Sequence, residues 1–333
     1  MHRLHALYVL DERAQSLVYG PAQRAAIAEM VDVLAEPLTA EQLAAEPELL
    51  AEAEILLSGW GAPLMDAAFL RRAPRLAAVF YGAGAVRGFA TDALFDRGVR
   101  LSSANAANAI PVAELTVAFV VLSLKRVWSL LGGALGPGDP RRHDVLGAYQ
   151  EVVGLLGLGA IGRLVADRLR TIDVTVLAYD PYCADAEAAA LGVDLVSLDE
   201  LFARSAVVSV HAPLYEQTRG IVTGPLVHSM RTGATLVNTA RGGLVRHDEL
   251  AEALASRPDL QAVLDVTDPE PMPPHHALRG LGNVVVTPHV AGSLGPECRR
   301  LGDTVVGELR RYLAGEPLAH EVDPATLAIA AEP

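Results

Sequence analysis

The sequence predicts two doubly wound α/β domains, and three observations lead to this fold class. Short apolar runs alternate with helical patterns along most of the chain, and strands separated by helices form parallel sheets with right-handed crossovers. Residues 152–180 read as strand, turn, helix and strand, with three glycines in the turn at the spacing G-x-G-x-x-G. The length of 333 residues suits two domains of ordinary size.

The first hundred residues contain the signals of one parallel sheet. We expect strands at residues 6–10, 31–34, 55–58, 76–81 and 99–102, and helices at 21–30, 39–53 and 63–71. The second helix would open with a capping box of Thr39 and Gln42. Glycine-bearing turns at 59–61 and 82–84 follow strands at their carboxyl ends, where open α/β sheets bind ligands.

A long helix is expected at residues 105–131, followed by a glycine-rich loop at 132–140. We therefore place the domain change near Asn105, with one domain formed by residues 1–104 plus 290–333 and the other by 105–289. Within the second domain, the later strands fall at 206–210, 235–238, 261–264 and 284–287. A last helix is expected at 297–313, and we expect the tail from Glu316 onward to pack loosely.

The glycine turn predicts a dinucleotide site. Gly157 permits the tight turn, Gly159 lets a pyrophosphate approach the backbone, and Gly162 lets the following helix pack closely on the strand. The free amides and positive dipole end of that helix then bind the phosphates. Asp180, at the end of the next strand, can accept hydrogen bonds from a ribose 2′-hydroxyl, which favours NADH over NADPH. The alternative for Asp180 is a turn residue before Pro181.

Composition narrows the classes of partner. The net charge of −13 argues against nucleic acid and against anionic membrane surfaces. Two cysteines, with no Cys/His cluster, predict neither a disulfide framework nor a metal site. The N-terminal apolar run is too short for a signal peptide, and residues 112–124 are too short to span a bilayer. These features predict a cytoplasmic protein.

Ionisable residues follow three of the later strands: Arg241, then Asp265 with Glu270, then His289. Parallel strands end at one edge of the sheet, which is also the edge of the glycine turn, so a mixed Arg/Glu/His site is plausible there. Each residue also has a purely structural alternative. Arg241 would be a surface arginine, Glu270 a solvated loop acid, and His289 a hydrogen-bonded core histidine, while Asp265 would cap a helix.

Four segments together resemble the D-isomer-specific 2-hydroxyacid dehydrogenase family. They are GLGAIG at 157–162, NTARGGLV at 238–245, LDVTDPEP at 264–271 and TPHVAGS at 287–293. The resemblance implies an NAD-dependent enzyme that interconverts 2-keto acids and D-2-hydroxy acids. It also implies a flavodoxin-like substrate domain with a Rossmann NAD-binding domain inserted in it, and a homodimer formed through the nucleotide domain.

Carried onto this sequence, the resemblance implies the roles of individual residues. Arg241 would hold the substrate carboxylate, His289 would exchange a proton with the 2-oxo group, and Glu270 would orient His289 and favour its protonated form. The implied cofactor-binding residues are Gly157, Gly159, Ala160, Ile161, Gly162, Asp180, His211, Pro213, Thr218, Thr239, Ala240, Asp265 and Gly292. The implied substrate-binding residues are Tyr81, Gly82, Ala83 and Gly84, together with Arg241.

The segment Tyr81-Gly82-Ala83-Gly84 also has its own physical reading, since successive backbone amides can form a nest for a carboxylate. A glycine-rich turn with no ligand fits this segment equally well. Many relatives have an aspartate where Val86 or its neighbour stands, so the identity of the substrate stays open. The loops at 59–63, 81–88 and 272–278 would shape the pocket for its side chain.

An alternative function is a regulatory or corepressor-like protein that binds NAD(H) on the same scaffold, because such a protein can retain the catalytic residues. The sequence offers no long disordered tail after its last helix for recruiting partners, which favours the enzyme.

Overall fold

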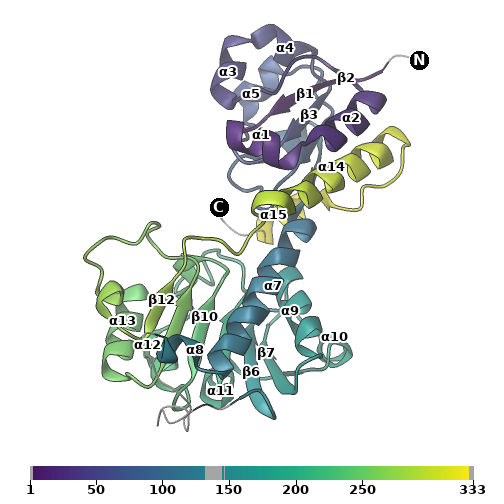
Figure 1. Cartoon of the computed structure of the whole chain (residues 1–333). Helices are drawn as coiled ribbons and strands as arrows, with labels where there is room; N and C mark the ends of the chain where they lie inside the picture. The colour runs from purple at the N-terminus through teal and green to yellow at the C-terminus, as the bar shows by residue number, and fades with distance from the viewer. Residues whose placement is uncertain (1–2, 132–144, 146, 330–333) are drawn as a thin grey trace. The chain divides into compact units, whose positions relative to one another are not determined.

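The computed structural model describes residues 3–131, 145 and 147–329 of the chain, so the predicted loop at 132–140 lies outside the described residues. The chain divides into two compact units (Figure 1). Unit 1 comprises Met1–Ala109 and Ser293–Pro333, and unit 2 comprises Ile110–Gly292. Unit 2 is thus inserted in the sequence of unit 1.

Unit 1 contains a six-stranded sheet in the order β13-β5-β4-β3-β1-β2. Its strands are β1 (His5–Val9), β2 (Asp32–Val33), β3 (Ile55–Ser58), β4 (Ala78–Tyr81), β5 (Arg100–Ser103) and β13 (Glu321–Val322). The first five are parallel, and β13 runs antiparallel to β5. The order 2-1-3-4-5 is that of a flavodoxin-like sheet, and its direction reverses between β1 and β3.

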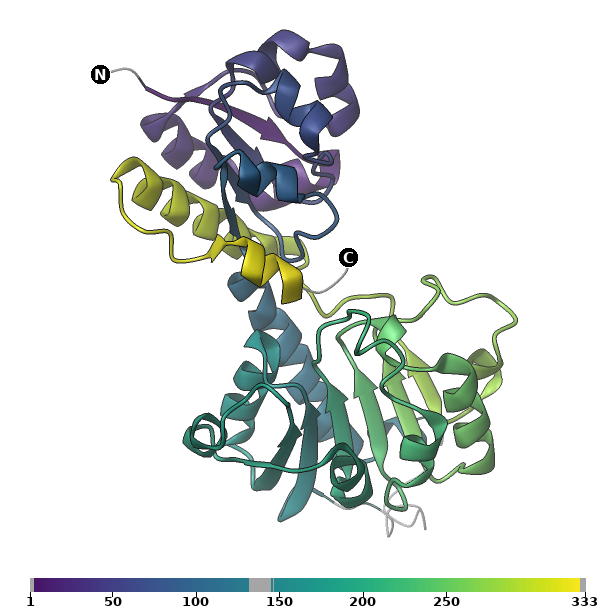
Figure 2. The ribbon, with the colours of Figure 1, turned by 180° about the vertical axis from the view of Figure 1, so that it is seen from behind.

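Helices cover both faces of this sheet, as Figures 1 and 2 show. One face carries α1 (Glu12–Val18), α2 (Pro21–Met30) and α14 (Cys298–Leu313), and the other carries α3 (Ala40–Ala45), α4 (Pro47–Glu52), α5 (Ala67–Arg72) and α6 (Asp92–Asp96). Strand β1 alternates between the two cores: Tyr8 packs with the first group, while Leu7 and Val9 pack with the second. This alternation follows from the two-residue period of a strand.

Two predicted helices of unit 1 have different bounds in the structure. The capping box of Thr39 and Gln42 is present, but the predicted helix 39–53 is two helices, because Pro47 opens α4 after α3 has ended. Helix α5 begins later than predicted, because the carboxylate of Asp66 accepts a hydrogen bond from the backbone N–H of Phe69 and caps the helix there.

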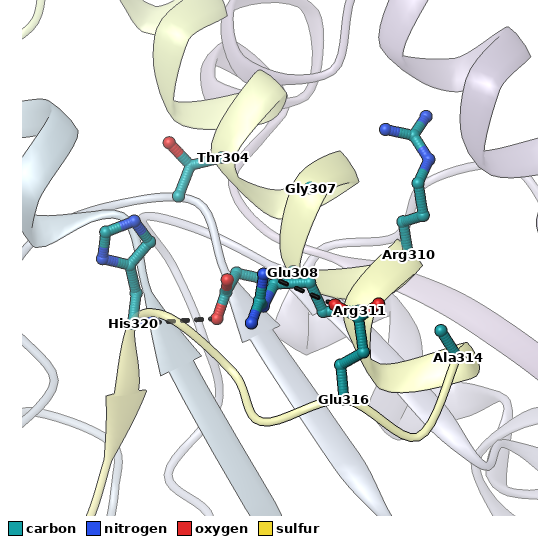
Figure 3. Close-up of a pocket in the computed structure, with 8 residues that line it drawn as sticks. All are labelled: Thr304, Gly307, Glu308, Arg310, Arg311, Ala314, Glu316 and His320. Carbon is teal, nitrogen blue, oxygen red and sulfur yellow. Dashed lines mark hydrogen bonds and ion pairs between the residues drawn. The ribbon is translucent and has the colours of Figure 1, made fainter.

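The prediction of a loosely packed tail was wrong. The segment after α14 returns as β13, continues into α15 (Pro324–Ile329), and is fixed by the buried carboxylate of Glu308. That carboxylate accepts hydrogen bonds from the backbone N–H groups of Ala319 (3.1 Å) and His320 (3.0 Å), as Figure 3 shows for His320. A buried acid with two backbone donors ties the tail to α14. The sequence of the tail contains no apolar pattern that would have predicted this contact.

Unit 2 contains a seven-stranded parallel sheet in the order β12-β11-β10-β9-β6-β7-β8. Its strands are β6 (Glu151–Leu156), β7 (Val174–Tyr179), β8 (Val193–Leu195), β9 (Val207–Val210), β10 (Thr235–Asn238), β11 (Gln261–Leu264) and β12 (Val284–Val286). Counted from β6, this is the Rossmann order 3-2-1-4-5-6 with one further strand, and it reverses between β6 and β9. The predicted fold class is therefore confirmed for both sheets.

Helices pack on both faces of this second sheet. The core on one face includes residues of α7 (Asn105–Leu124), α9 (Ala160–Leu169) and α10 (Asp185–Ala190), and the core on the other includes α11 (Leu198–Arg204), α12 (Gly224–His228) and α13 (His247–Ser256). The described part of the chain also has 3-10 turns at Gly242–Leu244 and Ala277–Gly280 in unit 2 and at Gly295–Glu297 in unit 1.

Helix α7 ends at Leu124 rather than at the predicted residue 131. Arg126 has a left-handed backbone with φ of 51°, which stops the helix, and a short helix α8 (Val127–Leu130) follows. By length and composition alone, α7 is the one described helix that could cross a membrane. More than half of it is buried in the protein, and Phe119 and Val120 belong to the core of unit 2. This burial is typical of a core helix.

Candidate functional site

The three glycines of the turn after β6 have different surroundings. Gly157 has φ of +101°, which glycine adopts readily, and a Cβ there would lie 2.8 Å from the backbone nitrogen of Ala212. A Cβ on Gly162 would overlap the carbonyl oxygen of Gly157. At Gly159, by contrast, a Cβ would meet nothing within 4 Å. The first and third glycines thus serve packing, while the second leaves open space beside the backbone.

That open space lies at the start of α9. Gly159 is the N-cap residue of α9, and no side chain caps this end of the helix. Both Gly159 and Ala160 are exposed. The first turn of a helix has amides without intrahelical partners, here those of Ala160, Ile161 and Gly162. Exposed amides and the helix dipole together form an anion site. The residues present therefore fit a bound pyrophosphate.

Asp180 is hydrogen-bonded to this turn from the end of the neighbouring strand. It follows β7, and its carboxylate accepts hydrogen bonds from the backbone N–H groups of Leu158 (2.7 Å) and Tyr182 (2.9 Å). The bond to Tyr182 is the local turn considered as an alternative for this residue, and the bond to Leu158 reaches into the glycine turn. Each carboxylate oxygen retains a lone pair, so the side chain can also accept from a ligand hydroxyl.

On the other side of β6, His211 and Thr218 shape the loop after β9. His211 is buried, its Nε2 lies 2.9 Å from the hydroxyl of Ser209, and burial lowers its pKa to about 3, so the ring is neutral near pH 7. The hydroxyl of Thr218 donates to the carbonyl of Pro213 (2.6 Å) and closes the turn between them. These residues hold the loop that faces the glycine turn across the sheet reversal.

Arg241 follows β10 in a turn that buried polar side chains fix. Asn238 donates from its side-chain amide to the carbonyl of Arg241 (2.9 Å) and accepts from the N–H of Ala240 (3.0 Å). The hydroxyl of Thr239 lies 2.7 Å from that of Thr116, and both are buried. Burial lowers the pKa of Arg241, and the charge of Glu270 opposes this effect. An arginine nonetheless stays protonated in proteins.

The sequence analysis did not predict Asn238 or Thr116 as residues of the site. Asn238 lies inside the NTARGGLV segment, so its position before Arg241 was a usable signal. Thr116 lies on α7, far from this segment in the sequence, and no local pattern marks it.

His289 and Glu270 form a direct pair. The imidazole Nδ1 lies 2.8 Å from a carboxylate oxygen of Glu270, and the two side chains are 48% and 41% exposed. Nδ1 is therefore engaged, and Nε2 remains for a ligand. His289 has φ of 53°, a left-handed conformation that costs a non-glycine residue about 1–3 kcal/mol and persists only where neighbours hold it.

Asp265 is the neighbour that holds the loop around His289. Its buried carboxylate accepts hydrogen bonds from the hydroxyl of Thr287 (2.6 Å) and from the N–H groups of Val290 and Ala291 (2.8 Å each). Its carbonyl oxygen also accepts from the N–H of His289 (3.0 Å). All these bonds lie within a few residues of the imidazole, so Asp265 fixes the backbone that presents it.

A hollow of about 570 Å³ opens beside this pair. Its lining includes Asp265, Glu270, Met272, Arg279 and His289. Arg241 does not line the hollow, although its charge and that of Glu270 influence each other. Gly292 is partly exposed and closes unit 2 just after the loop that Asp265 holds. The structure thus brings the predicted acid and histidine into contact at the edge where β11 and β12 end.

The predicted substrate segment belongs to unit 1 and follows β4. The N–H of Gly82 donates to the carbonyl of Ser58 (2.8 Å), so it is engaged within the sheet edge. No hydrogen bond from the N–H of Ala83 or Gly84 is found within the described part of the chain. The backbone amides of Ala83 and Gly84 can therefore bind an anion.

Together, the Rossmann sheet, the glycine turn and the Glu270–His289 pair define a dinucleotide-binding protein with an acid–base site at the same sheet edge. Residues 134–291 match the model of the NAD-binding domain of the D-isomer-specific 2-hydroxyacid dehydrogenases. The chain belongs to this family, which confirms the resemblance of the four segments.

Named relatives span several activities. The chain is 35% identical over 326 residues to D-3-phosphoglycerate dehydrogenase of Mycobacterium leprae, covering 96% of this chain and 59% of the relative. It is 33% identical over 224 residues to hydroxypyruvate reductase of Thermotoga maritima, covering 66% of this chain and 71% of the relative. The holo form of Rhodotorula graminis D-mandelate dehydrogenase has a TM-score of 0.79 at 25% identity, with 97% of this chain and 98% of the other covered. The chain thus spans about three-fifths of the mycobacterial relative.

Proposed function

We propose that the protein is an NADH-dependent 2-keto acid reductase, or D-2-hydroxyacid dehydrogenase in the reverse direction. The observation that carries this proposal is the contact of 2.8 Å between His289 and Glu270. A histidine oriented by a carboxylate is a proton donor and acceptor. It lies on a sheet whose carboxyl edge also bears a glycine turn with open space for a pyrophosphate.

The residues of unit 2 divide the work of such a reaction. When bound, NADH supplies the hydride for the 2-oxo carbon. His289 donates a proton from Nε2 to the 2-oxo oxygen, and it accepts that proton back in the oxidative direction. Glu270 keeps Nδ1 protonated and holds the ring in place. Arg241 is permanently charged, and its planar guanidinium binds the substrate carboxylate and polarises the 2-oxo group.

The remaining predicted residues hold the cofactor in this proposal. The amides at the start of α9 bind the pyrophosphate, and the loop from His211 to Thr218 lines the other side of the sheet reversal. Thr239, Ala240 and Gly292 would also contact the cofactor. Asp265 acts as a positioning residue, because its carboxylate is occupied by the loop of His289. For unit 1, the proposal is that Tyr81 and the amides of residues 82–84 bind the substrate.

Asp180 sets the preference for NADH in this proposal. A carboxylate accepts from a ribose 2′-hydroxyl and repels a 2′-phosphate. Asp180→Asn keeps an acceptor for the N–H of Leu158 but removes the charge. We expect it to raise the ratio of kcat/KM with NADPH to that with NADH about fivefold to tenfold, as loss of about 1 kcal/mol of repulsion would do. An unchanged ratio would contradict this role.

The function is tested by following NADH absorbance with glyoxylate, pyruvate, hydroxypyruvate and phenylpyruvate. We expect turnover with at least one of these keto acids. NADH binding without turnover of any of them would instead favour a regulatory NAD(H)-binding protein. We also propose a cytoplasmic location and a homodimer formed through unit 2. Sedimentation of the purified protein tests whether it forms a dimer.

A further inference from the structure

Arg163 lies in α9, directly after the last glycine of the turn. Its Nε donates a hydrogen bond to the carbonyl of Leu158 (2.8 Å), while the carboxylate of Asp180 accepts one from the N–H of the same residue (2.7 Å). The arginine and the aspartate therefore bind the two backbone polar groups of one residue in the glycine turn. Arg163 thus lies at the end of the proposed dinucleotide site where Asp180 would meet the ribose.

A second acid engages the same guanidinium. Nη2 of Arg163 donates to a carboxylate oxygen of Glu187 in α10 (2.9 Å), and the same nitrogen lies 4.0 Å from Sγ of Cys183. The hydrogen bond to Glu187 is the main reason why the pKa of Arg163 is raised, and the charge of Asp180 adds to this rise. Arg163 therefore lies in the field of two carboxylates, one on each side.

Positive charge is sparse around this end of the site. Residues 156–162, which contain the glycine turn, include no lysine or arginine, and neither do residues 179–190. NADPH differs from NADH by a phosphate on the ribose 2′-oxygen, and the planar fork of an arginine binds a phosphate best. Within these two segments and α9's first turns, Arg163 is the residue that offers such a fork.

The fork is already engaged by the protein. Nε and Nη2 form one edge of the guanidinium, and they donate to Leu158 and to Glu187. The side chains of Arg163 and Glu187 are 42% and 54% exposed, so both are open to solvent and to a ligand. Exposed ion pairs contribute little to the stability of a fold. The contact with Glu187 can therefore be removed without unfolding the chain, and its removal frees Nη2.

We infer that Glu187 limits the binding of NADPH by engaging Arg163, which otherwise binds the ribose 2′-phosphate. This inference rests on the proposed function, because it assigns to the pair of Arg163 and Glu187 a share of the preference for NADH. The carboxylate of Asp180 acts directly on the ribose in that proposal. Glu187 acts through Arg163, and it needs no contact with the cofactor to do so.

The test measures the Kd of the full chain for NADPH and for NADH by fluorescence titration, so the result does not depend on turnover. Glu187→Gln keeps the length of the side chain and removes its charge. We expect this variant to lower the ratio of the Kd for NADPH to the Kd for NADH about threefold to fivefold. The matched control is Asp185→Asn, which removes the same charge from another exposed residue of α10. It should change the ratio less than about twofold, because solvent and salt screen a charge without a partner.

A double variant shows whether the gain passes through Arg163. Adding Arg163→Gln to Glu187→Gln should abolish the gain in NADPH binding, with the ratio of the two Kd values as the readout. A gain that persists without Arg163 would overturn the inference, and so would an unchanged ratio in Glu187→Gln or equal effects of Glu187→Gln and Asp185→Asn. Binding of both dinucleotides without turnover of any keto acid would overturn the proposed reductase and leave the inference intact. Failure of the wild type to bind either dinucleotide would overturn both.

Discussion

The two units contain the same feature, a reversal in strand order, and use it differently. In unit 2 the reversal between β6 and β9 is lined by Gly157, Gly159 and the neutral, buried His211. In unit 1 the reversal between β1 and β3 is lined by the exposed side chains of Asp11 and Trp60. One edge therefore offers backbone amides, and the other offers side chains.

This difference explains what each edge can recognise. Backbone amides bind a part that every dinucleotide shares, the pyrophosphate, whatever substrate is reduced. The edge of unit 1 differs, because the exposed carboxylate of Asp11 forms no capping hydrogen bond and no ion pair in the described part of the chain. We therefore propose dinucleotide binding at the edge of unit 2, and the following predictions test the residues that form this edge.

The largest effect is expected at His289. His289→Ala should lower kcat about 10²-fold to 10⁴-fold, because the proton donor is lost, and the loss should be similar for every keto acid. NADH affinity, measured by fluorescence titration, should change little. Glu270→Gln should give a smaller loss of kcat, since the ring would remain but with a weaker partner. A His289→Ala variant with full activity would refute the assignment of the proton donor.

The glycine turn allows a sharper comparison within unit 2. Gly159→Ala adds a methyl group in open space with φ of −70°, so folding should be unaffected, but NADH should bind about tenfold or more weakly because the pyrophosphate loses its approach. Gly162→Ala forces a methyl group against the carbonyl of Gly157 and should destabilise the protein by about 1–3 kcal/mol in urea unfolding. Equal stability of the two variants would contradict their different surroundings.

The effect that is smallest near neutral pH concerns acid stability. The folded state holds His211 neutral with a pKa near 3, whereas the unfolded chain protonates it below about 6.5. The unfolded state thus binds more protons in this window, and stability falls as the pH falls, by at most about 1.4 kcal/mol per pH unit. Burial lowers the pKa of His247 and acts in the same direction. His211→Gln should flatten the curve of unfolding free energy against pH, and an unaltered curve would show that the imidazole is accessible.

Much of unit 2 could be predicted because the spacing of its glycines is typical of one backbone conformation. The spacing of Gly157, Gly159 and Gly162 requires a turn that approaches other backbone, and the structure shows such close approaches at the first and third positions. Arg241, Glu270 and His289 each follow a strand, so the parallel order alone placed them at one edge. Their catalytic roles remain proposals.

Other features depend on contacts that no local pattern contains. Asp11 and Trp60 are far apart in the sequence and meet only because β1 and β3 are neighbours. The tail is fixed by the buried carboxylate of Glu308, which reads in the sequence as one more acid on a helix. The end of α7 depends on the left-handed backbone of Arg126, a residue type that usually continues a helix.

The proposed acid–base role of His289 is tested most directly by one set of rates, kcat/KM of the wild type and of His289→Ala for the same panel of keto acids, with the affinity for NADH measured beside them. The account predicts that His289→Ala lowers every value by a similar factor, leaves the order of substrates unchanged and keeps the affinity for NADH. Full activity of His289→Ala, or a change in the order of substrates, would contradict it.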